Sequence, residues 1–166
     1  MNLILKTPYF DLCEENDFYF VNYPSEQVVV LAYFEKKILL IKQYRTLLGE
    51  DTYELPAGSA NIGENIKVAA RRELEEETGI FIEDLSRFVF HQTMVICPNR
   101  IINKSTIFKV NLNNIEYRDI KTPPQSEVDE AKLYELSEVK DMLLKNKINI
   151  SLPKAIILEH IYLENE

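Results

Sequence analysis

Residues 58–80 read GSANIGENIKVAARRELEEETGI, and four of the five positions 73–77 are glutamates. Neighbouring carboxylates repel one another, so such a run either faces water along a helix or surrounds a strong positive charge. The pattern is helical from about residue 64 to residue 78, and Gly79 suits the left-handed position that ends a helix. The positions of the acids around this helix decide between the two explanations.

Three of the four acids fall on the same side of the helix as its apolar stripe. These acids are Glu73, Glu76 and Glu77, and the stripe consists of Ile66, Ala69 and Ala70. A charged face exposed to water would place the acids away from the stripe. Carboxylates that are turned toward the protein body need a compensating positive charge to stay ionised.

Two sources of positive charge can compensate the acids. Arg72 directly precedes Glu73 and offsets part of the negative charge, and a bound divalent cation can offset the rest. Oxygen ligands without a nearby His or Cys favour Mg²⁺ or Mn²⁺ over zinc. The alternative is an arginine–glutamate network that holds no metal.

Composition limits the function classes. A chain of 166 residues with 46% hydrophobic and 28% charged residues is typical of one soluble globular domain. The net charge of −8 disfavours nucleic-acid binding. It does not disfavour a small anionic substrate, because a metal and a few arginines can reverse the local potential. With two scattered cysteines and no apolar run that could span a membrane, we expect a cytoplasmic protein with free thiols.

Strands alternate with helices along the chain, which favours an α/β layered fold. The predicted strands cover residues 27–34, 38–45, 51–58, 86–96, 105–112 and 131–136. The predicted helices after residue 80 cover 137–146, with Ser137 as the N-cap, and 152–165, with Pro153 in the first turn. Residues 1–24 have poor periodicity and are expected to form short strands at most.

At nine positions, residues 58–80 resemble the Nudix box. The matching residues are Gly58, Glu64, Arg72, Glu73, Leu74, Glu76, Glu77, Gly79 and Ile80. The resemblance implies a single Nudix domain over residues 1–166, an α/β/α sandwich with a mixed β-sheet. It also implies hydrolysis of a nucleoside diphosphate linked to another group. A ligand sensor or an interaction protein with the same fold is the alternative.

The residues before the box resemble ADP-ribose pyrophosphatases and related nucleotide-sugar hydrolases, which share Gln-Tyr-Arg (43–45) and Glu-Leu-Pro-Ala-Gly (54–58). This likeness implies that Arg45 contacts the pyrophosphate and that Glu54 lies at the substrate site. Alternatively, Arg45 ends a strand in water and Glu54 pairs with it. We therefore expect Mg²⁺-dependent hydrolysis of ADP-ribose or a related nucleoside diphosphate sugar to a nucleoside monophosphate and a sugar phosphate. A nucleoside triphosphate-cleaning enzyme is the alternative.

The family pattern also implies the roles of the box residues. The metal ligands would be Glu73, Glu76, Glu77 and the backbone carbonyl of Ala57. Arg72 would orient the glutamates. Glu64 would either bind a further metal or cap the start of the helix.

The general base is expected in the loop at residues 121–130, where Glu127 is the first candidate and Asp129 and Glu130 follow. One feature departs from the family. Residues 86–115 contain no Asp or Glu, and Arg100 and Lys104 occupy the loop where an acid is usual. Such a basic loop could hold a phosphate of the substrate, and then the substrate would differ from ADP-ribose.

The resemblance to ADP-ribose pyrophosphatases further implies a homodimer. Residues 1–24 contain the apolar and aromatic run FYFVNYP and are the candidate contact. The expected partners are therefore a small nucleotide substrate and a second copy of the chain, without nucleic acid or membrane.

Overall fold

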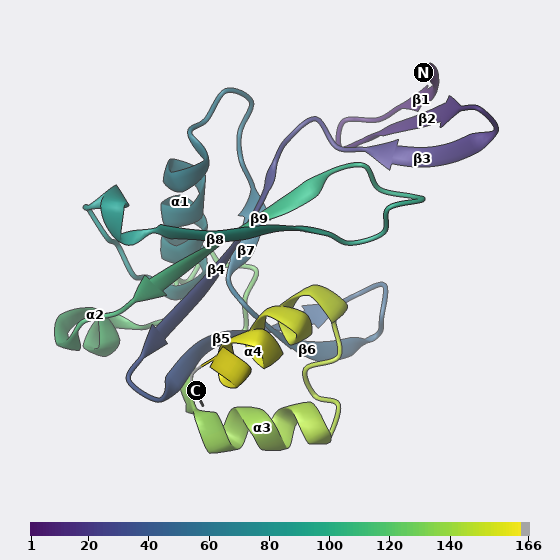
Figure 1. The fold of residues 1–166 in the computed structure, drawn as a ribbon. Coiled ribbons are helices and arrows are strands. Elements are labelled where there is room, and N and C mark those ends of the chain that lie inside the picture. Colours follow the sequence, from purple (N-terminus) through teal and green to yellow (C-terminus); the bar gives the residue numbers. More distant parts are fainter. Residues whose placement is uncertain (164–166) are drawn as a thin grey trace.

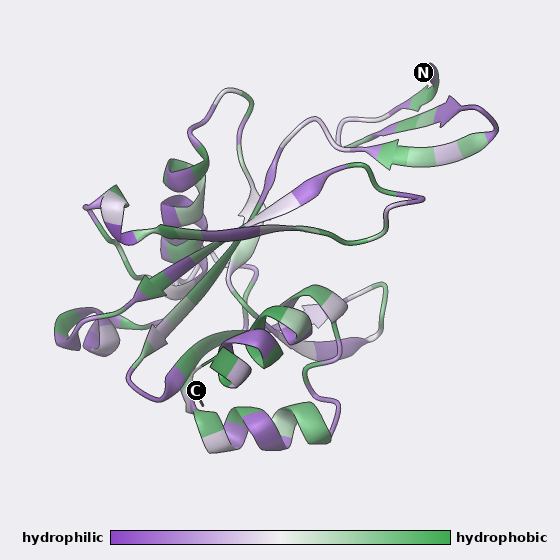
Figure 2. Cartoon of the chain, in the orientation of Figure 1, coloured by the Kyte–Doolittle hydropathy of each residue, from purple (hydrophilic) through white to green (hydrophobic). Residues whose placement is uncertain are grey.

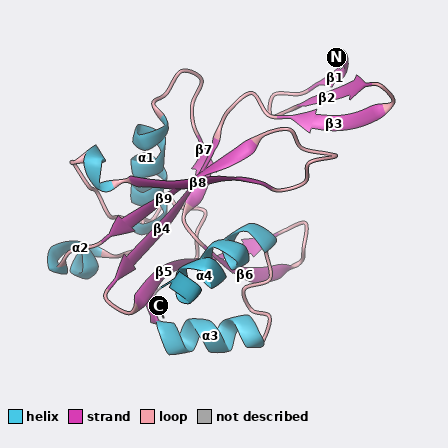
Figure 3. Ribbon diagram, in the orientation of Figure 1, coloured by secondary structure: helices cyan, strands magenta, loops and turns pink. Residues whose placement is uncertain are grey.

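The structure is a computed structural model that describes residues 1–163. A seven-stranded mixed sheet forms its centre (Figures 1 and 3). The strands in sheet order are β10 (Glu130–Glu135), β5 (Lys37–Arg45), β4 (Gln27–Phe34), β9 (Lys104–Asn111) and β8 (Val89–Val95), with β6 (Glu50–Glu54) on β5 and β7 (Ala57–Ser59) on β4. The contact between β4 and β9 is parallel and the other pairings in this sheet are antiparallel.

Helices cover both faces of this sheet. Helix α1 (Ile66–Thr78) lies on one face, and α3 (Leu136–Leu144) and α4 (Ser151–Leu163) lie on the other. The side chains of β4 alternate, so that Val28 and Val30 pack toward α1 while Val29 and Leu31 pack toward α3 and α4. The buried strand β4 therefore contributes side chains to both halves of the core. The predicted α/β/α sandwich with a mixed sheet is confirmed.

Helix α1 begins and ends at identifiable caps. The side chain of Asn65 accepts a hydrogen bond from the Lys67 N–H at 2.9 Å, so Asn65, and not Glu64, is the N-cap. Gly79 ends the helix with a φ of 73°, as predicted. Ala69 and Ala70 are fully buried, and their small side chains let the helix lie close to the sheet.

Residues 2–22 form a separate antiparallel sheet of β1 (Asn2–Lys6), β2 (Asp11–Glu15) and β3 (Phe18–Asn22). It extends away from the main body at the upper right of Figure 1. The Val21 N–H donates to the Arg100 carbonyl at 2.7 Å, which joins β3 to the loop between β8 and β9. This sheet contains hydrophobic segments, drawn in green in Figure 2, and several of its apolar residues are exposed.

Several predicted boundaries were wrong. Pro56 has no N–H and divides the single strand predicted at 51–58 into β6 and β7. A 3₁₀ turn, η1 (Leu85–Arg87), precedes β8, and the short helix α2 (Asn114–Asp119) had not been predicted. Ser137 is not an N-cap, because α3 already begins at Leu136.

Two glutamates cap the N-terminus of α3, because the N–H of the N-cap residue Glu135 donates to Glu138 Oε2 at 2.9 Å. Helix α4 does carry Pro153 in its first turn, as predicted. Its predicted end at residue 165 lies outside the described residues. None of the described helices is long and apolar enough to cross a membrane.

Candidate active site

A cavity of about 630 Å³ opens where β5, β7, α1 and the loop before β10 meet. Its walls bring together segments that are far apart in the sequence. The lining residues are Gln43, Arg45, Ala57, Gly58, Ser59, Glu73, Glu76, Glu77, Pro123, Gln125, Ser126 and Glu127. Three carboxylates of α1 therefore share one cavity with an arginine and with an acid of the loop.

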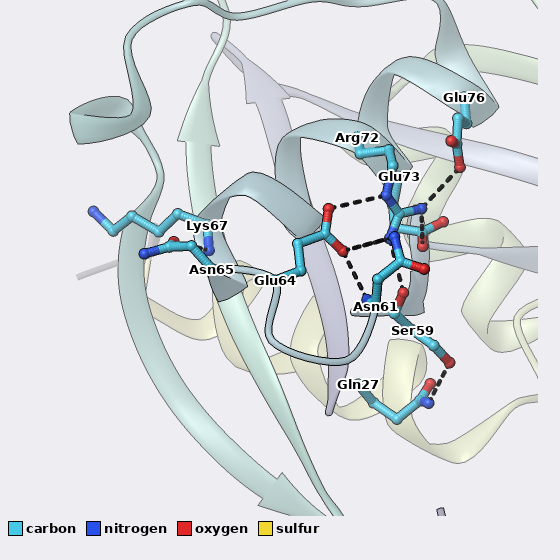
Figure 4. Close-up of polar contacts among 9 residues, drawn as sticks. All are labelled: Gln27, Ser59, Asn61, Glu64, Asn65, Lys67, Arg72, Glu73 and Glu76. Carbon is cyan, nitrogen blue, oxygen red and sulfur yellow. Dashed lines mark hydrogen bonds and ion pairs between the residues drawn. The ribbon is translucent and has the colours of Figure 1, made fainter. Parts of the chain in front are cut away.

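Arg72 holds the acids of α1 in place (Figure 4). Its guanidinium donates to Glu73 at 2.7 Å, to Glu76 at 3.0 Å and to both carboxylate oxygens of Glu64. A fifth hydrogen bond reaches the Ser59 carbonyl at 2.8 Å. A guanidinium has five N–H groups, so these contacts leave Arg72 no donor for a substrate. Its position fits the predicted orienting role.

Glu64 is fixed by this network and not by the helix end. Its pKa is lowered first by the hydrogen bonds from Arg72 and then by the Asn61 N–H, which lies 2.7 Å from Glu64 Oε2. The cap role considered for Glu64 belongs to Asn65. A role in binding a further metal stays a prediction.

Glu73 and Glu77 lack sufficient positive charge. Burial raises the pKa of Glu77 to about 8, and within residues 1–163 its one hydrogen bond comes from the Ala57 N–H at 3.0 Å. Burial also raises the pKa of Glu73, although Arg72 acts in the opposite direction. Glu76 is more open, with 56% of its side chain exposed. Glu73 and Glu77 thus face the cavity and the protein body, as the helical pattern predicted, whereas Glu76 lines the cavity from an exposed position.

The chemistry of these groups fits a hard divalent cation. Arg72 supplies one positive charge to the three carboxylates of Glu64, Glu73 and Glu76, and the cation that acts on Glu77 is Arg45, which already pairs with Glu54. The pKa values of Glu73 and Glu77 are raised in spite of these arginines. Oxygen donors of this kind are the ligands that Mg²⁺ and Mn²⁺ prefer. Across residues 1–163, no three His, Cys, Asp or Glu side chains are already gathered as metal ligands. Instead, Arg72 forms hydrogen bonds with Glu73 and Glu76.

Gly58 is required by the position of Glu73. A Cβ atom on Gly58 would lie 2.1 Å from the carboxyl carbon of Glu73, which is far inside van der Waals contact. Any other residue at position 58 would therefore displace this carboxylate. The sequence marks Gly58 as a box position, but the steric reason depends on how β7 and α1 pack together.

Arg45 and Glu54 form a bidentate ion pair. Arg45 Nε lies 2.7 Å from Glu54 Oε1, and Nη2 lies 2.7 Å from Oε2. Arg45 lines the cavity, whereas Glu54 is 6% exposed and lies behind it. Of the two alternatives for Glu54, the structure shows the pairing with Arg45.

The three loop acids have different surroundings. Glu127 lines the cavity. Asp129 fastens the loop to β5, because its carboxylate accepts from the Tyr44 N–H at 3.1 Å. Glu130 accepts from the Tyr134 hydroxyl at 3.2 Å. Glu127 is therefore the one of the three that is placed to meet a substrate.

The basic residues Arg100 and Lys104 do not line this cavity. A second cavity of about 370 Å³ shares one lining residue, Ser59, with the first. Its other lining residues are Tyr9, Tyr23, Gln27, Ile96, Ile101, Asn103 and Ser105. The sequence had given no signal for Tyr9, and it had marked Tyr23, in the run FYFVNYP, only as part of a candidate dimer contact.

Comparisons with known proteins agree with this geometry. The model of the Nudix domain matches residues 23–154. A methanol dehydrogenase activator of Bacillus methanolicus is 36% identical over 83 residues, which are 50% of this chain and 45% of that protein. An ADP-ribose pyrophosphatase of Bacillus subtilis (strain 168) is 37% identical over 73 residues, which are 44% of this chain and 40% of that protein.

The matched regions thus span less than half the length of these two curated relatives. A crystal structure of an ADP compounds hydrolase superposes with a TM-score of 0.69 at 18% identity, and covers 99% of this chain and 91% of that chain. That likeness shows the shared fold. The family model covers most of the chain. It includes Gly58 and the three acids of α1 at the cavity, and Arg72, which contacts two of these acids. The chain belongs to the Nudix family.

Proposed function

We propose that the protein is a Nudix pyrophosphohydrolase that uses Mg²⁺, or Mn²⁺, to hydrolyse ADP-ribose or a related nucleoside diphosphate sugar. The products are a nucleoside monophosphate and a sugar phosphate. The observation that carries this proposal is the single cavity that holds Arg45, the three acids of α1 and Glu127. The similarity to an ADP-ribose pyrophosphatase supports the choice of substrate.

The box residues provide the metal site in this proposal. Glu73, Glu76, Glu77 and the backbone carbonyl of Ala57 would hold the cation. A bound divalent cation neutralises phosphate charge and lowers the pKa of a water molecule. Arg72 keeps the glutamates oriented and does not contact the substrate, since its donors are already engaged.

Arg45 binds the pyrophosphate. Its guanidinium lies on the cavity wall with three N–H groups that Glu54 does not use. Planar guanidinium groups are suited to binding phosphate oxygens. Glu54 stays behind the wall and fixes Arg45, so its contribution to substrate binding is made through the arginine.

Glu127 accepts the proton of the attacking water. It belongs to a loop whose ends are tied to the core, since the Asp129 N–H donates to the Lys42 carbonyl at 2.8 Å. Pro123 and Pro124 restrict the other end. The loop can therefore move over a substrate without disturbing the sheet.

The second cavity offers a place for the base or sugar. It is more apolar than the first, carries two tyrosines and shares the lining residue Ser59 with the catalytic cavity. Aromatic side chains stack well against flat rings. A substrate whose pyrophosphate lies at the first cavity could extend into the second.

The proposal includes a homodimer and a cytoplasmic location. Apolar side chains of residues 1–24 stand exposed on the N-terminal sheet; they include Leu3, Ile4, Leu5, Tyr9, Phe18 and Tyr19. Such surfaces are usually covered by a partner. Static light scattering at micromolar concentration tests the dimer, and the mass of a monomer would contradict it. Both cysteines are free, which is usual in a reducing compartment.

A panel of substrates tests the activity. ADP-ribose, other nucleoside diphosphate sugars and nucleoside triphosphates are incubated with Mg²⁺, and the released nucleotide is identified by chromatography. We expect AMP and ribose 5-phosphate from ADP-ribose or the equivalent pair from a related sugar. Release of pyrophosphate from triphosphates alone would favour the nucleotide-cleaning alternative.

A second candidate is a protein that acts on another enzyme. The name of the Bacillus methanolicus relative, an activator of methanol dehydrogenase, favours it. Ligand binding without turnover of any compound in the panel would support this candidate, or a sensor, against the hydrolase.

A further inference from the structure

Thr52 is a fully buried polar residue beneath the Arg45–Glu54 pair. Its hydroxyl lies 2.6 Å from Glu54 Oε1 and 3.2 Å from the carbonyl of Gln43, which is its cross-strand partner on β5. A hydroxyl has one proton to donate. The shorter contact leads to a charged carboxylate, and charge-assisted hydrogen bonds are the stronger ones. Thr52 therefore donates to Glu54.

This hydrogen bond gives the Glu54 carboxylate a third donor beside the two from the arginine. Oε1 of Glu54 receives both the Thr52 hydroxyl and Nε of Arg45, and Oε2 receives Nη2 of Arg45. Because the carboxylate is buried, water is poorly placed to replace a missing donor. The orientation of Glu54 thus depends on Thr52, and the orientation of Arg45 depends on Glu54.

Arg45 and Arg72 differ in what they can still bind. Arg72 makes five hydrogen bonds and has no donor left. Arg45 uses two of its five N–H groups on Glu54, and its side chain is 42% exposed at the cavity. Whether its remaining donors face the cavity is decided by the plane of the guanidinium, and the bidentate pair with Glu54 sets that plane.

We propose that Thr52 is a positioning residue for pyrophosphate binding. Through Glu54 it holds the Arg45 guanidinium in the plane that presents its free N–H groups to the substrate. Thr52 is fully buried and is not part of the cavity wall, so it acts without touching the substrate. The inference rests on the proposed role of Arg45.

The test compares Thr52→Val and Thr52→Ser with the parent in steady-state hydrolysis of ADP-ribose. Valine keeps the volume and the strand preference but removes the hydroxyl, whereas serine keeps it. We expect Thr52→Val to raise KM about fivefold with kcat unchanged, because an interaction with both ground and transition state is weakened. Thr52→Ser should restore the KM of the parent. Thr93→Val, on the exposed side of edge strand β8, is the matched control and should leave KM unchanged.

A double-mutant cycle with Arg45→Gln separates positioning from a general loss of packing. In the Arg45→Gln background, Thr52→Val should raise KM no further, because the group that it positions is gone. Equal KM values for parent and Thr52→Val, no rescue by serine, or a full additive effect in the double variant would each overturn the proposal.

A second readout keeps the inference apart from the proposed activity. If the folded parent does not hydrolyse ADP-ribose, the activity proposal fails, and binding of inorganic pyrophosphate in calorimetry decides the role of Thr52. Binding about fivefold weaker in Thr52→Val, with serine restoring it, supports the inference. Equal affinity in parent and valine variant, or no binding by the parent, overturns it.

Discussion

Arg72 and Arg87 both pair with glutamates, but their surroundings differ in charge balance. Arg87 contacts the single carboxylate Glu116 through both terminal nitrogens and donates to the Asn111 carbonyl at 2.6 Å. Arg72 contacts three carboxylates, whereas Glu77, among the residues that the structure describes, accepts a hydrogen bond from the backbone N–H of Ala57 alone. One cluster is balanced, and the other has surplus negative charge.

The pKa values of the two clusters move in opposite directions. Burial acts to raise the pKa of Glu116, but the hydrogen bonds from Arg87 and Asn113 outweigh it and lower the value. Burial raises the pKa of Glu73 and Glu77. The carboxylate of Glu116 is compensated by its arginine partner, whereas the surplus buried acids of α1 could be compensated by a bound cation. In the proposed function, this difference in charge balance distinguishes the metal-binding cluster from the structural pair.

The largest expected effect is the loss of activity in Glu77→Gln, by about 10³-fold in kcat/KM. The substitution removes the negative charge of a proposed metal ligand and keeps the shape of the side chain. The free energy of unfolding of the metal-free protein should not fall, since the variant removes surplus charge. Steady-state kinetics and urea unfolding check both halves. Activity equal to the parent at saturating Mg²⁺ would show that the cluster is no metal site.

Glu127→Gln should lower kcat by about 10²-fold while KM and Mg²⁺ affinity stay near the parent values, the pattern of an interaction made only in the transition state. Asp129→Asn and Glu130→Gln are the comparisons, and they should lower kcat less because their carboxylates are engaged elsewhere. If the single loop variants keep full kcat, the general base must instead be a glutamate of the box, and Glu73 is then the first candidate.

Gly58→Ala should reduce kcat/KM by about tenfold to 10²-fold, because the new methyl group displaces the Glu73 carboxylate. Gly49→Ala is a useful contrast. A Cβ there meets nothing within 4 Å, but its φ of 72° makes the substitution strained. Gly49→Ala should lower the melting temperature and keep kcat/KM. If Gly58→Ala kept kcat/KM while Gly49→Ala lowered it, the steric reason for glycine at position 58 would be refuted.

The smallest effect on activity is expected for Glu116→Gln. It should lower the free energy of unfolding by about 1–2 kcal/mol at neutral pH and leave kcat/KM unchanged. The folded-state pKa of Glu116 lies below its ordinary value of 4.5, so the stabilisation is present above that pH and disappears as pH falls through the folded value. Unfolding curves from pH 7 to pH 3 should therefore converge for parent and variant. A constant difference across that range would contradict the lowered pKa.

The sequence was sufficient for the parts of the fold that have local signals. The helix of the box, its end at Gly79 and the strand pair around residues 27–45 follow from periodicity and cap chemistry. Boundaries failed where two local signals compete. Ser137 is a good N-cap residue, yet the N-cap is Glu135, two residues earlier, where Glu135 pairs with Glu138.

Features that depend on packing between distant segments could not be predicted. The pairing of Arg45 with Glu54 was one of two open alternatives, and only the register of β5 on β6 decides it. The need for glycine at position 58 arises from contact with α1. Residues 1–24 were expected to form short strands at most, and their pairing into a sheet could not be predicted. Cys13 and Phe20 are buried, but β1 is exposed along its whole length, so the apolar alternation is weak.

Melting curves of the parent and Glu77→Gln across millimolar Mg²⁺ test the central claim most directly, since they need no substrate. A cation bound only by the native state should raise the melting temperature of the parent by about 5–10 °C at 100-fold excess over its Kd. The rise should be absent or much smaller in Glu77→Gln. An unchanged melting temperature of the parent throughout the titration would contradict the claim that the surplus acids of α1 form a metal site.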